Sequence, residues 1–274
     1  MSRQSGLDIL DAITSHLAVG MPIGDLHDNP NFNHSAPAAL AFACLRASTD
    51  ISLSLAPDLL QRILSSRVGM AVLEADLLRG PAEAFQFAGG EIFGVPADQA
   101  FQEPGSQYEQ FLRRAATALR GIGYPPRFAA FIGAVLREAC DNATEHAQAR
   151  SIPLVCYQVA GPAWSVAVVD SGCGVLASLK QNHRFSALRS DIEALRLALK
   201  DGVSRVADDL RGRGYSLVKK RVTDLGAAVR LRSGSAWASL SAPAGGLPHE
   251  EFRAVSGRLP GFLFLMHGTA QKAA

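Results

Sequence analysis

The sequence predicts an α/β protein. Apolar residues recur at spacings of three and four from Phe131 to Ala143, which places them on one face of a helix. Two β-branched runs follow at 153–159 and 164–170, separated by a short loop with Gly161 and Pro162, and they predict a hairpin. A chain of 274 residues is long enough for one large domain or two small ones.

Composition excludes several classes of function. Apolar residues make up 48% and charged residues 19%, and the formal net charge of +2 gives no overall signal for nucleic acid or an anionic membrane. The sequence contains no apolar run long enough to span a membrane and no signal-peptide core at the N-terminus. The cysteines are far apart, which predicts reduced thiols and a cytoplasmic protein without a zinc site: Cys44, Cys140, Cys156 and Cys173.

The first part of the chain, 1–104, predicts a smaller α/β segment. Apolar periodicity predicts helices at 7–18, 37–47 and 56–74, and alternation predicts a strand at 51–55. Glycine and proline concentrate between 80 and 105, so we expect a second domain to begin at residue 105. The segment carries no recognisable motif, and partner binding is the role that we consider for it.

The second part, 105–274, predicts helices and strands in an irregular alternation. Helix 108–119 ends at the glycines and prolines of 121–126, and the helix that contains Phe131 follows. After residue 174 we expect two more helices, 191–200 and 215–225. Three further strands complete the predicted sheet: 229–232, 237–240 and 259–265.

Three polar motifs stand out. Glu138 and Asn142 are four residues apart and share one helix face, and His146 lies one turn further. Asp170 ends a strand and begins a turn with two glycines, Asp170-Ser171-Gly172-Cys173-Gly174. A second glycine-rich loop opens a helix: Arg211-Gly212-Arg213-Gly214-Tyr215-Ser216-Leu217. Glycines let a backbone approach a ligand closely, and a helix N-terminus favours phosphate, but each motif alone is equally typical of a solvated helix face or an ordinary turn.

Taken in order, the motifs at 138–142, 170–174 and 212–214 resemble the N, G1 and G2 boxes of the Bergerat-fold ATP-binding superfamily. This superfamily includes gyrase, the Hsp-type chaperone, the histidine kinases and MutL. Asn142-Ala143-Thr144-Glu145-His146-Ala147 looks most like the N box of bacterial anti-sigma serine kinases. The resemblance covers about residues 105–267. For this part of the chain it implies a Bergerat-type sandwich, in which helices cover one face of a mixed sheet.

The resemblance implies ATP and Mg²⁺ as cofactors. In that reading Asp170 accepts from the adenine amino group, and Gly172 and Gly174 let the chain curl beneath the base. Asn142 offers an oxygen to Mg²⁺, and Glu138 orients or deprotonates the attacking water or hydroxyl as the catalytic residue. The phosphate end is assigned to His146 and to the glycine-rich loop: Arg211, Gly212, Arg213, Gly214, Tyr215, Ser216 and Leu217.

The implied activity is phosphorylation or sequestration of a regulatory protein partner, as in the anti-sigma kinases. The alternative is a catalytically weak binding module that responds to nucleotide. Residue 262 favours that alternative, because family members often have Gly-Thr in the last strand whereas this chain has Gly261-Phe262, or Ser233-Gly234-Ser235 in another alignment. The interval 175–211 corresponds to the lid over the nucleotide, and we expect it to close on binding. A homodimer is compatible with the resemblance.

Overall fold

The computed structural model describes residues 84–87, 89–95, 103–146, 153–170, 172–200, 218–219, 221–222, 226–242 and 248–270. The predicted N-terminal elements, helices 7–18, 37–47 and 56–74 and strand 51–55, lie outside these residues. The predicted helix 215–225 is described at four positions, all of them helical. The described part is α/β, as expected.

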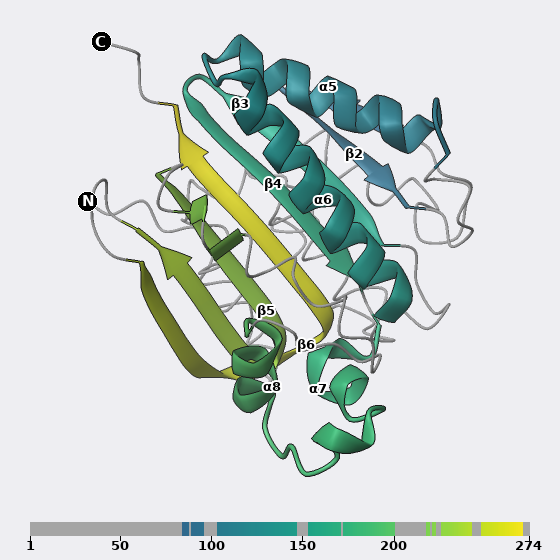
Figure 1. Cartoon of the computed structure of the whole chain (residues 1–274), viewed down its shortest axis with the longest axis vertical. Helices are drawn as coiled ribbons and strands as arrows, with labels where there is room; N and C mark the ends of the chain where they lie inside the picture. The colour runs from purple at the N-terminus through teal and green to yellow at the C-terminus, as the bar shows by residue number, and fades with distance from the viewer. Residues whose placement is uncertain are drawn as a thin grey trace, which may run out of the picture.

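The six strands of the sheet are ordered β1-β2-β3-β4-β6-β5 (Figure 1). Their bounds are β1 Ala84–Phe87, β2 Gly90–Gly94, β3 Leu154–Ala160, β4 Ala163–Asp170, β5 Ala227–Ser241 and β6 His249–Thr269. Every described pairing is antiparallel, so the prediction of a mixed sheet is wrong for this part of the chain. Short connections join β1 to β2, β3 to β4 and β5 to β6, and such connections reverse the chain direction.

Two long helices, α5 (Gln107–Gly121) and α6 (Pro126–His146), lie side by side over one face of the sheet (Figure 1). The apolar stripe predicted for α6 is confirmed, because Phe128, Ile132, Leu136, Ala139 and Ala143 are buried in the main core. None of the helices in the described part of the chain is long and apolar enough to cross a membrane.

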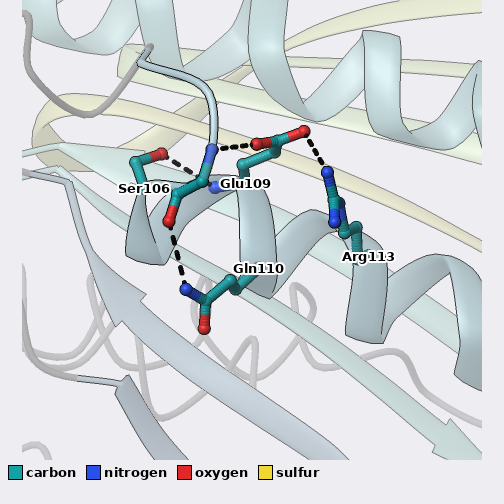
Figure 2. A network of polar contacts seen from close by, with 5 residues as sticks. Ser106, Glu109, Gln110 and Arg113 are labelled. Atoms are coloured by element: carbon teal, nitrogen blue, oxygen red, sulfur yellow. Dashed lines mark hydrogen bonds and ion pairs between the residues drawn. The ribbon is translucent and has the colours of Figure 1, made fainter.

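The start of α5 is fixed by local hydrogen bonds (Figure 2). The hydroxyl of the N-cap residue Ser106 accepts from the backbone N–H of Glu109 at 3.2 Å. The Glu109 carboxylate in turn accepts from the backbone N–H of Gly105 and from Arg113. This reciprocal arrangement satisfies donors that a helix end otherwise leaves unpaired. The helix ends at the predicted glycines, with Gly123 at a φ of 99°.

The hairpin of β3 and β4 is confirmed, with a turn at Gly161 and Pro162. Trp164 at its start packs edge-on against Tyr124 and Phe128, and its Nε1–H donates to the Tyr124 hydroxyl at 2.8 Å. This aromatic group ties the connection between α5 and α6 to the beginning of β4.

Strands β1 and β2 fall within the stretch that glycine and proline content assigned to a boundary, but they pair with the sheet. Glu91 on β2 is fully buried and accepts two hydrogen bonds from the Arg114 guanidinium on α5, at 2.6 and 2.8 Å. The hydroxyl of Tyr157 on β3 also donates to Glu91. Residues 84–94 therefore belong to the same body as the helices and strands that follow.

The interval after Gly174 is packed rather than extended. It contains α7 (Gly174–Leu179), the short helix η4 (His183–Phe185) and α8 (Asp191–Ala198), which matches the helix predicted there. Ala194 and Leu195 of α8 are fully buried, and α8 packs on β5. The section up to residue 200 is thus docked on the sheet, whereas 201–211 of the predicted lid lies outside the described residues.

The strands predicted at 229–232 and 237–240 form one strand, β5, whose register with β6 is irregular around Ser233 and Gly234. Arg232 beside this irregularity is fully buried and donates through Nη1 to the carbonyl oxygens of Gly234 and Ala236. These bonds tie the Arg232 side chain to the backbone of the irregular part of β5. The strand predicted at 259–265 is also longer and forms part of β6.

Candidate functional site

Two of the three predicted motifs come to one end of the sheet. The C-terminal end of α6 and the C-terminal end of β4 lie next to each other, close to α7 (Figure 1). Alternation along β4 places Asp170 on the face that α6 covers, because Val166 and Val168 belong to the core beneath the helices. Glu138, Asn142 and Asp170 are therefore on the same side of the sheet.

Asp170 is buried, with a relative exposure of 1%. Its Oδ1 accepts from the backbone N–H of Gly172 at 2.8 Å, and the backbone of Phe262 on the paired strand also lowers the pKa of the carboxyl. Its Oδ2 is buried and has no hydrogen-bond partner in the described part of the chain. Burial raises the pKa of Asp170 to about 7, against the lowering effect of the two backbone bonds.

The turn after Asp170 depends on glycine at residue 174. Gly174 has a φ of +75°, and an added Cβ would lie 2.9 Å from Ser233 Oγ and 3.1 Å from the Gly261 carbonyl oxygen. The hydroxyl of Ser233 accepts from the Val175 N–H at 2.9 Å and donates to the Gly261 carbonyl at 3.0 Å. The turn is thus held closely against β5 and β6.

On α6, Glu138 and Asn142 are both half-buried. The amide Nδ2 of Asn142 donates to Glu138 Oε1 over a long distance of 3.4 Å. The amide oxygen of Asn142 has no hydrogen bond to another described residue, so it can coordinate a ligand from outside. The predicted sharing of one helix face by these two side chains is confirmed.

The side chains of the remaining predicted site residues are not described, so their positions relative to Asp170 and Asn142 are not established. His146 is the last residue of α6, and only its place in the helix is described. The glycine-rich loop lies outside the described residues: Arg211, Gly212, Arg213, Gly214, Tyr215, Ser216 and Leu217. Their roles stay predictions.

A pocket of about 190 Å³ lies beside the turn, between α7 and the irregular part of β5. Cys173 and Gly174 line it, together with Lys180, which caps the C-terminal end of α7, and Arg258 of β6, but neither Asp170 nor Asn142 does. We place the candidate site at Asp170 and Asn142 rather than in this pocket, because the unsatisfied acceptor and the free amide oxygen are there. The described residues hold no group of three or more His, Cys, Asp or Glu side chains that could bind a metal by themselves.

The sequence left the alignment of the last strand open, and the sheet register decides which residues meet Asp170. Phe262 pairs with Asp170 on one side and with Ser233 on the other. The hydroxyl of Ser233 is used to hold the turn, and the donor from Phe262 to Asp170 is a backbone group. The only sequence signal for Ser233 was a hydroxyl next to a glycine, because its hydrogen-bond partners, Val175 and Gly261, lie on two distant elements, α7 and β6.

Helix α8 is anchored by a second contact, which the sequence did not indicate. The Asp191 carboxylate accepts from both the backbone N–H and the hydroxyl of Ser235, each at 2.9 Å. A Cβ at Gly234 would overlap this carboxylate.

Comparison of the chain with models of protein families, with curated proteins and with solved structures found no match.

Proposed function

We propose that the protein binds ATP with Mg²⁺ in a Bergerat-type site formed by β4, the turn after it and the C-terminal half of α6. The observation that carries the proposal is Asp170, which is buried and whose Oδ2 has no hydrogen-bond partner among the described residues. A buried acceptor without a donor destabilises a protein by about 1–3 kcal/mol. A ligand that brings an N–H group to Oδ2 would remove this penalty.

The adenine amino group is such a donor. The Gly172 N–H holds Oδ1 in place, so the carboxylate presents its other oxygen in a fixed orientation. The glycines of the turn have no side chains to obstruct a flat base. The position of α5 and α6 on one face of the sheet and the order of the motifs along the chain support the proposal of a Bergerat-type arrangement.

The donor chemistry of α6 fits Mg²⁺. This ion prefers oxygen ligands and usually retains water and phosphate oxygens, so a single amide oxygen from Asn142 is a sufficient protein contribution. When bound, Mg²⁺ would neutralise charge on the phosphates. Glu138 lies beside Asn142 and would orient or deprotonate a nucleophile near the phosphate end.

The leading activity is phosphoryl transfer to a serine or threonine of a protein partner, as the likeness of the N box to anti-sigma kinases suggests. A second candidate is a module that binds ATP and a partner without turnover. Phe262 favours this second function, because it pairs with Asp170 and has no hydroxyl, whereas members of the superfamily that the chain resembles often have Thr in this strand. In both proposals the protein acts in the cytoplasm.

Titration calorimetry with ATP and GTP in the presence of Mg²⁺ tests the recognition step. GTP carries an acceptor where ATP carries the amino group, so we expect the wild type to bind ATP and to discriminate against GTP. Asp170→Asn should weaken ATP binding by about 1.5–3 kcal/mol, which is roughly ten- to a hundredfold. Absence of ATP binding by the folded wild type, or equal binding of ATP and GTP, would overturn the proposal.

A second experiment separates binding from chemistry. With labelled ATP, Glu138→Ala should retain nucleotide binding and lose the formation of ADP or phosphoprotein, whereas Asn142→Ala should weaken the Mg²⁺-dependent part of binding. Glu103→Ala, at an exposed position before α5, is the matched control. Wild-type binding without ADP or phosphoprotein would select the binding module over the kinase, and full turnover in Glu138→Ala would exclude Glu138 as the base.

A further inference from the structure

The face of the sheet opposite α5 and α6, which we call the rear face, is apolar across four strands. The registers place Ile92, Cys156, Ala167 and Leu265 in one cross-strand row. A second row on the same face contains Leu154, Val169 and Leu263. Side chains of neighbouring strands in one row point to the same side of a sheet, so these residues form a continuous surface.

This rear face is buried. The relative exposure of Ile92, Cys156, Ala167 and Val169 is 0%, and that of Leu265 is 4%. None of these residues belongs to the core cluster that joins α5, α6 and α8 to the other face. Strands that are apolar on both sides are typical of a sheet covered on both faces. Because the burial is reached within one chain, neither a second copy nor a separate protein is required.

We propose that residues 1–83 of the same chain cover the rear face as a second layer. They immediately precede β1, which is the edge strand of the sheet, so the chain enters the fold beside this face. Their sequence supplies the apolar surface needed, because Leu60, Ile63 and Leu64 fall on one face of the helix that periodicity predicts at 56–74.

The charges of the two parts are complementary. Residues 1–83 contain nine acidic and five basic residues, a formal charge of −4. Residues 84–274 contain sixteen acidic and twenty-two basic residues, a formal charge of +6. Arg230 and Arg232 continue the two apolar rows onto β5, so the rear face is flanked by cations at this side. Opposite net charges favour association of the two parts over self-association of either.

The proposal does not depend on nucleotide binding, but it places the N-terminal segment next to the candidate site. Val169 and Leu263 of the rear face directly adjoin Asp170 and Phe262, which pair across β4 and β6. The layer would therefore lie behind the strands that carry the buried carboxylate.

Two buried cysteines provide matched probes in the full chain. Cys156 lies on the rear face, and Cys140 of α6 lies in the core on the other face. Both have a relative exposure of 0%, and burial raises the pKa of each thiol to about 12. We would label the protein with a maleimide and locate the label by peptide mass. In the wild type both thiols should be protected, at low and at high protein concentration.

Ile63→Asp places a charge on the predicted apolar face of 56–74, and Gln61→Asp is the control two residues away on the opposite face. We expect Ile63→Asp to raise the labelling rate of Cys156 by about tenfold or more while Cys140 stays protected, since only the rear layer opens. Gln61→Asp should change neither rate. If Cys156 of the wild type reacts freely, the rear face is open and the proposal is wrong. If Cys156 is protected only at high protein concentration, a second copy of the chain covers the face instead. Protection of Cys156 in Ile63→Asp would also overturn the proposal.

If Ile63→Asp unfolds the whole protein and exposes both thiols, a full-length chain that can be cleaved after folding tests whether residues 1–83 cover the rear face. A site-specific protease sequence inserted between Gly80 and Pro81 allows the backbone to be cut after folding. The two pieces should co-elute in gel filtration with Cys156 still protected. Separation of the pieces while Cys156 remains protected would overturn the proposal, because the cover would then come from another part of the chain.

Discussion

Glu91 on β2 and Asp170 on β4 are both buried carboxylates on the helix-covered face of one sheet, but their surroundings differ. Glu91 receives a paired hydrogen bond from Arg114 and a third bond from Tyr157. Asp170 receives only backbone N–H groups at its described contacts, and its Oδ2 has no partner among them. The chain satisfies the buried carboxylate of Glu91, and this difference is what supports the proposal that Asp170 binds a ligand.

The largest effect is expected at the satisfied carboxylate. Arg114→Ala leaves Glu91 buried without its cation, and loss of one partner of a buried ion pair costs about 3–5 kcal/mol. Burial of Glu91 is complete, although Arg114 itself is 36% exposed, so we expect the lower end of that range. Urea denaturation measures the free energy of unfolding. A loss below 1 kcal/mol would mean that Glu91 is not dependent on this pair.

The unsatisfied carboxylate should reveal itself through pH. The pKa of Asp170 rises from an ordinary 3.8 to about 7 on folding. Between these two pH values the folded state therefore keeps a proton on Asp170 that the unfolded state has lost. This contribution to stability is complete below pH 4 and disappears as pH rises through 7, a change of up to about 4 kcal/mol. Urea denaturation at several pH values should show this slope in the wild type and not in Asp170→Asn. An equal slope in both proteins would assign the effect to other groups.

The turn beside Asp170 should be sensitive to a single methyl group. Gly174→Ala combines a left-handed backbone with contacts to Ser233 and Gly261, and should destabilise the protein by about 2–3 kcal/mol. Gly161→Ala is the matched control, because Gly161 also has a positive φ, of +58°, but has no atom within 4 Å of the added Cβ. It should cost about 1 kcal/mol. Equal thermal shifts in the two variants would show that the turn is loosely packed.

The smallest effect on stability is expected at Arg113, the residue next to Arg114. Arg113 pairs with Glu109 on the exposed side of α5, and its side chain is 73% exposed. Solvent screens such a pair, so Arg113→Ala should change stability by less than about 0.5 kcal/mol. A loss comparable to that of Arg114→Ala in the same urea experiment would show that the charges of α5 act together rather than through the buried carboxylate.

The sequence predicted best those elements whose signals are local. Periodicity identified α6 and α8, and turn chemistry identified the hairpin of β3 and β4, because a few adjacent residues determine each of them. Strand direction and pairing depend on distant residues, so the mixed sheet was expected only from the resemblance, and the described pairings are all antiparallel. The short strands β1 and β2 were assigned to a boundary for the same reason, since their glycine-rich sequence is stabilised by pairing with β3.

The candidate site was predictable in its residue types but not in its electrostatics. The spacing of Glu138 and Asn142 fixes their shared face, and the position of Asp170 follows from the strand that it ends. The sequence does not show that Asp170 Oδ2 is left without a partner, or that Ser233 is engaged by Val175 and Gly261. These facts arise from contacts among elements that are far apart along the chain.

β6 lies between β4 and β5 in the sheet although it follows both in sequence. During synthesis β4 leaves the ribosome well before its partner, with an edge of unpaired N–H and C=O groups and apolar side chains on both faces. Such edges invite pairing with other chains and aggregation. Asp170 also lacks its strand partner until Phe262 has emerged, so nascent and prematurely terminated chains should depend on chaperones.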